Sequence, residues 1–222
     1  MCKLWVWVML MQCIDCHEDA DVDELLRLIA GAEDELTSKH TTKAVVMITD
    51  MKSFSKMTEE DGSVTSAKQI QRHRDLLLPL INSYGGKGKS TGGDGLVAAF
   101  GSASDAMHAA VTMQRTLDEY NTGHDGEREM VIRIGIADGE IVLDRGGRPF
   151  IGNALNLAAR VMDLGDGGQA FTTKPVVEAA KASDIATHRH GAVELKNIAE
   201  PVEAIEILWA QGQKPTKPRI LG

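Results

Sequence analysis

The sequence predicts an α+β domain in which a mainly antiparallel sheet carries its helices on one face. Short apolar runs rich in β-forming residues alternate with amphipathic patterns, in the order strand, helix, hairpin, helix and strand, followed by further elements. Of the 222 residues, 43% are hydrophobic and 25% charged, which is ordinary for a globular chain. The cysteines, Cys2, Cys13 and Cys16, all lie near the start, so no disulfide framework supports the body and a reducing cytoplasm is expected.

Residues 1–20 differ from the rest of the chain. Leu4–Met11 form an apolar run, but it is much shorter than the ~20 residues that a membrane helix needs. No cleavage site of a signal peptide follows it. Cys13–His17 match the C-x-x-C-H pattern of haem attachment, yet that attachment requires export, which nothing else in the sequence supports. We expect a short packing segment or a misassigned start codon here.

Three further segments complete the expected organisation. Residues 21–40 carry apolar residues at helical spacing after a capping Asp21 or Asp23, and this helix either packs on its own domain or dimerises ahead of it. Residues 41–210 form the main domain, which is long enough to bury a core without disulfides or metals. Residues 211–222 are expected to be a flexible tail.

The elements of the main domain follow from periodicity and from the positions of glycine. An apolar strand over 44–49 ends at Asp50, and a helix over 66–84 ends at a glycine pair. A hairpin with Gly92–Gly95 at its tip comes next. We then expect a helix, a second hairpin around Asp138 and Gly139, a helix, a strand, a helix and two late strands. The two strands of the first hairpin are expected over 87–91 and 96–100, and those of the second over 131–137 and 140–143. The helices are expected over 104–120, 153–163 and 174–182, and the later strands over 169–172, 193–195 and 202–208.

Two aspartates stand at the ends of predicted strands. Asp50 follows the first strand, and Asp94 lies in the glycine-flanked turn of the first hairpin. If these strands are neighbours in one sheet, both carboxylates reach the same edge. Carboxylate oxygens of this kind suit Mg²⁺ or Mn²⁺, whose remaining ligands are water and substrate phosphates. Taken singly, each aspartate is more typical of a turn or a helix cap.

Two other features fit the handling of a phosphorylated ligand. Backbone N–H groups at the strand-to-helix turn over 51–55 can hold phosphate oxygens. Asn156 and Arg160 are four residues apart and share one face of a predicted helix, where asparagine is a poor helix former. An amide can hold a ribose oxygen while a guanidinium meets developing phosphate charge. A surface arginine beside a tolerated asparagine explains the pair equally well.

Five segments in this order resemble the catalytic domain of the class III adenylate and guanylate cyclases. They span nearly all of the main domain and together form a specific pattern, although each alone is only moderately specific. The resemblance implies a ferredoxin-like antiparallel sheet and a head-to-tail homodimer. The segments are Asp50–Ser55 (DMKSFS), Lys89–Phe100 (KSTGGDGLVAAF), Arg133–Gly139 (RIGIADG), Phe150–Arg160 (FIGNALNLAAR) and Glu194–Val202 (ELKNIAEPV).

The resemblance implies an enzyme that converts a nucleoside triphosphate to a 3′,5′-cyclic nucleotide and pyrophosphate. Asp50 and Asp94, with the carbonyl of Met51, would bind two Mg²⁺ or Mn²⁺ ions. Asn156 would orient the ribose, and Arg160 would stabilise the transition state. In the family these two groups come from different subunits, so a homodimer with shared sites is expected. The implied phosphate-binding residues are Lys52, Ser53, Phe54, Ser55, Arg133 and Lys196.

The base-recognition positions depart from the family pattern. Adenylate cyclases carry a lysine four residues before the second metal-binding aspartate and an aspartate or threonine seven before the asparagine, where this chain has Ser90 and Pro149. Lys89 is one place early, and alternation along a strand predicts that it points to the opposite face unless a bulge re-aims it. Pro149 offers no N–H. Ser53 replaces a glycine, which is harmless if its φ is negative.

These departures leave the base open. ATP is slightly favoured because it is the commoner substrate of the family. UTP or CTP is the main alternative, since no sensor domain is recognisable and the chain is in this respect similar to the stand-alone pyrimidine cyclases of bacterial anti-phage signalling. GTP is the least favoured.

Other function classes fit less well. The turn Gly92–Gly95 resembles the GGDEF turn of diguanylate cyclases, but the glutamate is missing and Asn156 and Arg160 have no role there. A non-catalytic cyclase-like domain is disfavoured because both aspartates, the asparagine and the arginine are retained. The net charge of −8 argues against a nucleic-acid partner, which needs a concentrated basic patch.

Overall fold

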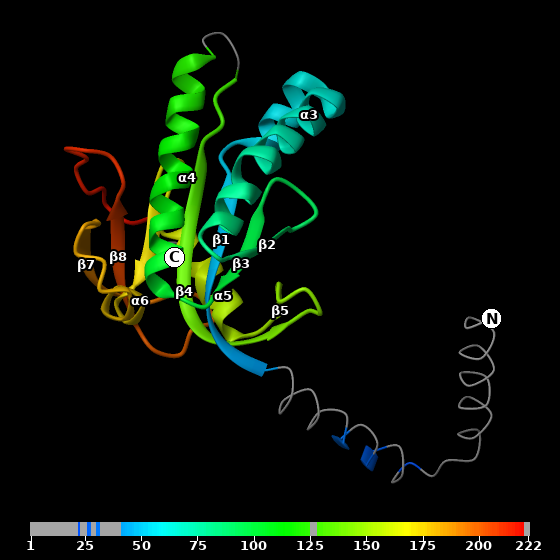
Figure 1. Ribbon diagram of the computed structural model, residues 1–222, viewed down its shortest axis with the longest axis vertical. Helices are drawn as coiled ribbons and strands as arrows, with labels where there is room; N and C mark the ends of the chain where they lie inside the picture. The colour runs from blue at the N-terminus through cyan, green and yellow to red at the C-terminus, as the bar shows by residue number, and fades with distance from the viewer. Residues whose placement is uncertain (1–21, 23–25, 28–29, 32–40, 125–127, 220–222) are drawn as a thin grey trace. The chain divides into compact units, whose positions relative to one another are not determined.

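The computed structural model describes residues 22, 26–27, 30–31, 41–124 and 128–219 (Figure 1). Its contacts divide the chain into two units, Met1–Thr41 and Thr42–Gly222. The described residues before Thr41 are helical and fall within the helix predicted over 21–40. The segment 1–20, with its C-x-x-C-H pattern, lies outside the described residues. The domain boundaries and a dimerising role for the helix stay predictions.

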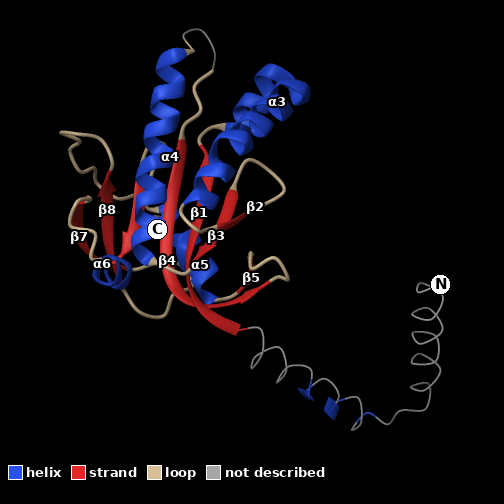
Figure 2. Ribbon diagram, viewed as in Figure 1, coloured by secondary structure: helices blue, strands red, loops and turns tan. Residues whose placement is uncertain are grey.

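The second unit contains an eight-stranded sheet with the strand order β2-β3-β1-β4-β6-β8-β7, and β5 pairs with β4 (Figure 2). Among the described pairings with a known register, β4–β6 is parallel and the others are antiparallel. The predicted α+β fold with a mainly antiparallel sheet is therefore confirmed. The elements are β1 Thr41–Met51, α3 Phe54–Ser83, β2 Lys87–Ser90, β3 Leu96–Phe100, α4 Ala103–Gly123, β4 Ile132–Leu143, β5 Pro149–Ile151, α5 Asn153–Asp163, β6 Ala170–Thr173, α6 Lys174–Ala180, β7 Ala186–Val193 and β8 Val202–Leu208.

Helices cover both faces of the sheet. On the first face, here called the helix face, α3, α4 and α6 pack on the strands through large side chains such as Leu77, Met107 and Val176. On the opposite face, α5 packs through Ala154 and Ala158 against β1, β3 and β4. The expectation that the helices share one face thus holds for α3, α4 and α6 and is wrong for α5.

A missing side chain lets α5 lie against the sheet. A Cβ atom at Gly135 in β4 would come within 2.2 Å of the carbonyl oxygen of Ala158 and 2.4 Å of the amide nitrogen of Met162. Because these are backbone atoms, α5 could not move aside without moving as a whole. Periodicity alone identified α5 correctly as a helix over 153–163, but it carries no information about which face the helix covers.

The second hairpin lies later than the sequence predicts. The Asp138-Gly139 pair does not turn the chain, because Ile132–Leu143 is one continuous strand. Gly139 has a φ of 151°, and a Cβ atom added to it would lie 3.4 Å from the Cβ of Ala154 in α5. This glycine therefore allows α5 to lie close to the strand and does not form a turn. The chain reverses after β4, where the carboxylate of Asp144 accepts the N–H groups of Gly146 and Arg148 at 2.8 and 3.0 Å.

Two other elements differ from the prediction. The helix predicted over 66–84 is the second part of the longer α3, which is interrupted by non-helical dihedrals at Gly62 (φ 81°, ψ 163°). The polar residues before this kink lack a clear apolar stripe, so periodicity did not find them. The strand predicted over 193–195 shares only Val193 with the observed β7, so most of this prediction is wrong; the residues of β7 are mostly exposed and do not alternate between apolar and polar.

The predicted tail contains no helix or strand over the described residues 211–219. It nevertheless contacts the domain, since the backbone N–H of Thr216 donates to Glu206 at 2.9 Å and that of Arg219 donates to the carbonyl of Leu164 at 2.8 Å. Its flexibility stays a prediction. The described helices include none that is long and apolar enough to cross a bilayer.

Candidate active site

Asp50 and Asp94 lie close together at one edge of the sheet. Strands β1 and β3 pair antiparallel, and Thr49 faces Leu96, so the end of β1 adjoins the turn that precedes β3. Burial raises the pKa of the Asp94 carboxyl, and the negative charge of Asp50 raises it further, whereas the backbone N–H groups of Asp94 and Met51 act in the opposite direction. This repulsion requires the two carboxylates to be neighbours.

The turn that carries Asp94 is held from two sides. Arg74 of α3 donates to the carbonyl of Gly93 at 3.0 Å. The hydroxyl of Thr91 donates to the carbonyl of Gly95 at 3.2 Å, and an added Cβ at Gly95 would lie 2.8 Å from the carbonyl oxygen of Thr49. The glycines therefore let the turn approach β1 closely enough for the carboxylates of Asp50 and Asp94 to meet.

This pair of carboxylates fits a divalent cation better than a monovalent partner. Its oxygens are hard ligands, and their mutual repulsion is relieved when a cation lies between them. No group of three or more His, Cys, Asp or Glu side chains that could hold a metal occurs in the described part of the chain. A cation here would therefore complete its coordination with a carbonyl such as that of Met51, with water and with phosphate oxygens, as Mg²⁺ commonly does.

The strand-to-helix turn over 51–55 adjoins the two aspartates. The backbone N–H of Lys52 donates to the carbonyl of Val131 at 2.8 Å, which ties the turn to the segment before β4. Phe54 and Ser55 lie in the first turn of α3, where the N–H groups have no partner within the helix and can hold phosphate oxygens. The side chain of Lys52 is exposed and pairs with Asp166 at 3.2 Å.

Ser53 adopts a left-handed conformation, with φ 61° and ψ 21°. The condition under which a serine would be harmless here, a negative φ, is therefore not met. The chain must reverse direction sharply between β1 and α3, and a left-handed residue makes that turn. The hydroxyl of Ser53 does not cap the helix, so the serine gains no side-chain hydrogen bond there in return for its strained backbone.

Arg133 contacts both the aspartate pair and α5. Its Nε and Nη2 donate to one oxygen of Asp50, Oδ2, at 3.0 and 2.8 Å, and its Nη1 donates to Oδ1 of Asp163 at 3.1 Å. The other oxygen of Asp163 lies 3.5 Å from Nη1 of Arg160. Sequence reasoning identified Arg133 and Arg160 but missed Asp163, although its position three residues after Arg160 on the same helix was a usable signal.

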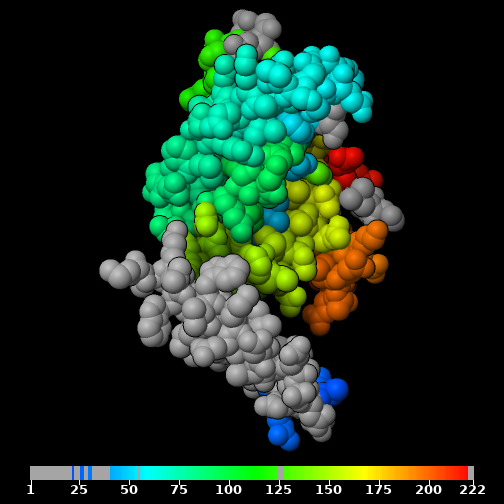
Figure 3. Space-filling view, turned by 90° about the vertical axis from the view of Figure 1, so that its right-hand side faces the viewer, coloured from blue at the N-terminus to red at the C-terminus, as the bar shows by residue number. Residues whose placement is uncertain are grey.

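Two of the remaining predicted residues, Asn156 and Lys196, are exposed on the surface. Asn156 is exposed on α5, one turn before the half-exposed Arg160. Lys196 is exposed in the loop between β7 and β8. Figure 3 shows blue atoms of β1 between the cyan surface of α3 and the yellow surface of α5. The structure thus brings Asp50, Asp94 and the 51–55 turn together on one side of α5.

Lys89 and Ser90, two positions expected to recognise the base, lie on the opposite faces of the sheet from those predicted. Lys89 pairs with Val97, and Ser90 pairs with Leu96. Val97 belongs to the core under α5, whereas Leu96 belongs to the core of the helix face. Lys89 therefore lies on the α5 face and Ser90 on the other, so the prediction that Lys89 points away is wrong. Strand alternation cannot be counted back from Asp94, because Asp94 lies in the turn outside the paired residues.

An aromatic ring lies beside Lys89. The Nζ of Lys89 is 5.7 Å from the centroid of the Phe150 ring, within the range of a cation–π contact. Phe150 is 64% exposed, while the neighbouring Pro149 is buried. An ammonium group and an exposed aromatic face are therefore available on the α5 face, whereas Pro149 presents nothing polar.

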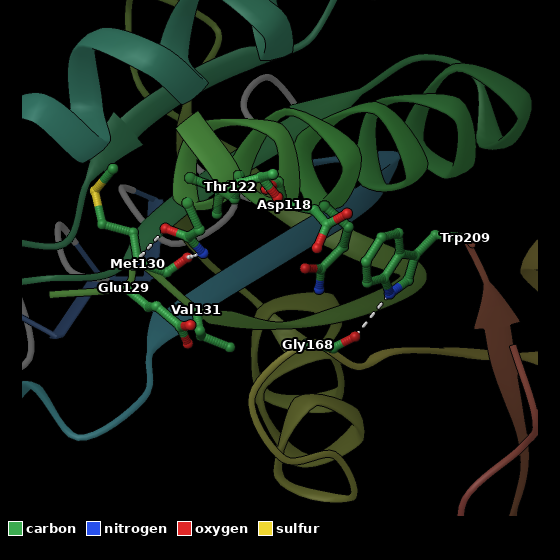
Figure 4. Close-up of a pocket in the computed structure, with 10 residues that line it drawn as sticks. Asp118, Thr122, Glu129, Met130, Val131, Gly168 and Trp209 are labelled. Atoms are coloured by element: carbon green, nitrogen blue, oxygen red, sulfur yellow. Dashed lines mark hydrogen bonds between the residues drawn. The ribbon is translucent and has the colours of Figure 1, made fainter. Parts of the chain in front are cut away.

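Two cavities lie near the entrance to β4. One, of about 340 Å³, lies behind the 51–55 turn and is lined by Met51, Lys52 and Ser53, among others. Another, of about 390 Å³, lies between α4 and the segment before β4. In Figure 4 its lining includes Asp118 on α4 and Trp209, whose indole N–H donates to the carbonyl of Gly168 at 2.7 Å. Sequence reasoning predicted neither cavity.

Residues 36–209 match the family described as the adenylate and guanylate cyclase catalytic domain. The chain is 29% identical over 172 residues to the putative adenylate cyclase 3 of Rhizobium meliloti, covering 77% of this chain and 28% of that protein. It is 26% identical over 172 residues to the adenylate cyclase of Anabaena cylindrica, covering 70% and 34%. The chain therefore spans only a minor part of these relatives.

Solved structures share the fold. The adenylyl cyclase CyaB from P. aeruginosa aligns with a TM-score of 0.66 at 19% identity, covering 82% of this chain and 99% of that one. The adenylate/guanylate cyclase/hydrolase from Silicibacter pomeroyi aligns with a TM-score of 0.64 at 26% identity, covering 76% and 97%.

Proposed function

Because the chain belongs to the family of adenylate and guanylate cyclase catalytic domains, we propose that it is a nucleotidyl cyclase, which converts a nucleoside triphosphate to a 3′,5′-cyclic nucleotide and pyrophosphate. The observation that carries this proposal is the neighbouring carboxylate pair of Asp50 and Asp94, in which the charge of one raises the pKa of the other. A non-catalytic domain would have no need to keep two mutually repelling carboxylates.

The proposed site divides its tasks among several groups of this chain. Two Mg²⁺ or Mn²⁺ ions held by Asp50, Asp94 and the Met51 carbonyl would make the 3′-hydroxyl more acidic and offset charge at the phosphates. The N–H groups at the start of α3 would hold the β- and γ-phosphates. Arg133 and Lys196 would add positive charge around the triphosphate. The residues of the turn that take part are Lys52, Ser53, Phe54 and Ser55.

A second copy of the chain would complete each site. Asn156 is exposed on α5 and would orient the ribose of a nucleotide held by the other subunit, while Arg160 would stabilise charge that develops at the α-phosphate. We therefore propose a head-to-tail homodimer with two shared sites. A similar solved structure, from Blastocladiella emersonii, is described as a non-canonical dimeric guanylyl cyclase domain, so it is a precedent for a dimer of this fold but not for the head-to-tail arrangement.

ATP is the substrate that we propose. The first relatives are named adenylate cyclases, and Lys89 on the α5 face can donate to an acceptor nitrogen of the base. A pyrimidine triphosphate is the second candidate, because the buried Pro149 cannot accept a hydrogen bond from the adenine amino group through its side chain. Exposed Phe150 could stack on either kind of base.

The test is direct product identification. Purified protein is incubated with Mn²⁺ and ATP, GTP, UTP or CTP separately, and the products are identified by mass spectrometry. We expect cyclic AMP from ATP, and almost none from Asp94→Asn under the same conditions. Asp118→Asn, which removes an exposed carboxylate of α4, is the matched control and should retain activity. Cyclic UMP or CMP as the main product would replace ATP by the pyrimidine candidate, and the absence of every cyclic nucleotide would overturn the proposal.

A further inference from the structure

The carboxylate of Asp163 contacts two arginines, Arg133 and Arg160, to which we assign different functions. Its Oδ1 accepts from Arg133 at 3.1 Å, and its Oδ2 lies 3.5 Å from Arg160. Arg133 also binds Asp50 at 2.8 Å. On the proposed function, Arg133 serves the site built on its own subunit, whereas Arg160 serves the site of the other subunit. One side chain therefore touches a residue of each of the two sites of a dimer.

Asp163 occupies a place that needs an explanation. It is the last residue of α5, where the helix dipole is negative and disfavours a carboxylate. Aspartate is also among the weaker helix formers. Only 24% of its side chain is exposed, so it is partly removed from water as well. The two guanidinium groups offset this unfavourable electrostatic position, and their presence explains how the carboxylate is tolerated there.

We propose that Asp163 is a positioning residue that fixes Arg133 at one active site and Arg160 at the other. This inference rests on the proposed cyclase function. Arg133 reaches Asp50 with Nε and Nη2 and Asp163 with Nη1, so Asp163 holds the guanidinium at the edge of the aspartate pair even when the oxygens of Asp50 are engaged elsewhere. Its second oxygen limits the motion of Arg160, which is otherwise 37% exposed.

The two roles predict different kinetic defects. Arg133 would contact the triphosphate in the ground state, so loss of its anchor should raise KM. Arg160 would act on charge that appears in the transition state, so loss of its anchor should lower kcat. A misplacement of about 1 Å can cost up to about 10²-fold in rate, and we expect about a 5-fold to 30-fold change in each parameter.

A mixed dimer separates these effects. One copy carries Asn156→Ala and Arg160→Ala, the other carries Asp94→Asn, and the two are purified through different tags. Only one complete site then remains, with its aspartates on the first copy and its asparagine and arginine on the second. Asp163→Ala placed in the first copy should raise KM, and the same change in the second copy should lower kcat. Asp118→Ala in either copy is the control for removing a carboxylate.

The mixed dimer gives different results if the shared-site arrangement is wrong and if the positioning role of Asp163 is wrong. An inactive mixed dimer, with an active unmodified homodimer, would overturn the shared-site arrangement itself. An active mixed dimer in which Asp163→Ala has no effect, or the same effect in both copies, would overturn the positioning role of Asp163. A merely structural role would lower the melting temperature and give no difference between the copies.

A binding measurement provides a readout independent of turnover. Tripolyphosphate is titrated into the homodimer with Mn²⁺ present, and binding is followed by calorimetry. Removing a negative charge should by itself tighten the binding of an anion. We expect Asp163→Ala to weaken it about 5-fold instead, because Arg133 loses its anchor, and Asp118→Ala to leave it unchanged or slightly tighter. Tighter binding by Asp163→Ala would contradict the proposal.

Discussion

The two faces of the sheet carry hydrophobic cores of different size. The helix face is filled by large side chains such as Leu77, Phe100 and Met107 beneath α3, α4 and α6. The α5 face has two smaller cores, in which alanines of α5 such as Ala158 pack beside larger side chains such as Ile141 and Phe171, and the ion pairs of Arg133 lie next to them. Because buried apolar area stabilises a fold, the larger core should supply more of the stability, and the α5 face, which carries the charged groups, is the one on which we propose the nucleotide site.

Asp94→Asn tests the α5 face and should have the largest effect. The substitution keeps the size of the side chain but removes the charge that makes the pair with Asp50 suited to a cation. We expect cyclase activity to fall by about 10³-fold or more, while the free energy of unfolding rises slightly because a like-charge repulsion is lost. Activity assays and urea denaturation on the same sample check this, and an active Asp94→Asn enzyme would be incompatible with the aspartate pair as the reaction centre.

Leu77→Ala is the matching test of the helix face. Leu77 is fully buried between α3 and the sheet, so its truncation leaves a cavity and should lower the free energy of unfolding by about 2–5 kcal/mol. Activity per folded molecule should change little, since the residue lies on the other side of the sheet from α5. Urea denaturation and a turnover assay well below the melting temperature check this. A large loss of activity in folded protein would show that the two faces are not separable.

Acidification tests whether the helix face tolerates charge. His73 of α3 is fully buried, and neither ring nitrogen has a hydrogen-bond partner. Burial, with a smaller contribution from the charge of Arg74, lowers the pKa of His73 from 6.5 to about 4. The folded state therefore binds this proton less readily than the unfolded state. The stability that depends on neutral His73 is complete above pH 6.5 and is lost as the pH falls towards 4.

The size of this effect can be isolated with one variant. A shift from 6.5 to about 4 corresponds to a loss of up to about 3 kcal/mol between pH 7 and pH 4. His73→Leu keeps an apolar side chain of similar size and removes the proton-binding group, so its stability should fall less over that range. The check is urea denaturation of both proteins at pH 7, 5.5 and 4. Parallel losses in the two proteins would exclude His73 as the cause.

The sequence predicted the elements whose apolar pattern is governed by the core. The first strand, β3 and β8 contain runs of buried apolar residues, and α4 and α5 have buried residues at helical spacing; both patterns follow from burial. The elements that were predicted wrongly or only in part are those whose sequence of apolar and polar residues is not determined by burial. Strand β7 is exposed at the edge of the sheet, and the early part of α3 before Gly62 has few buried residues.

The site was predictable as a set of residues but not as a set of contacts. Asp50, Asp94 and Arg133 carry recognisable motifs, yet nothing in the spacing shows that Arg133 pairs with Asp50 and Asp163. The contact of Arg133 with Asp163 depends on α5 crossing the face opposite the other helices, which Gly135 permits. The face of Lys89 likewise follows from the register of β2 on β3, which lies beyond a count of residues from Asp94.

Ser53→Gly should have the smallest effect, and it should raise the free energy of unfolding, which Leu77→Ala lowers. A left-handed conformation costs a serine about 1–2 kcal/mol relative to its preferred backbone regions, while glycine adopts it freely but loses more chain entropy on folding. The two contributions leave a net gain of about 0.5–1 kcal/mol in the free energy of unfolding. Because the hydroxyl of Ser53 caps nothing, no hydrogen bond is lost to offset that gain.

The functional consequence of Ser53→Gly separates backbone from side chain at the proposed phosphate turn. If the N–H groups of the turn bind the phosphates, KM should stay within about 2-fold of the unmodified enzyme, since glycine keeps the same φ and the same N–H. Ser53→Ala is the control, because it also removes the hydroxyl but retains the strained backbone, and it should be no more stable than the original protein. A rise in KM in both variants would assign phosphate binding to the hydroxyl instead of the backbone. A rise in KM in Ser53→Gly alone would show that the restricted backbone of serine keeps this turn in its binding conformation.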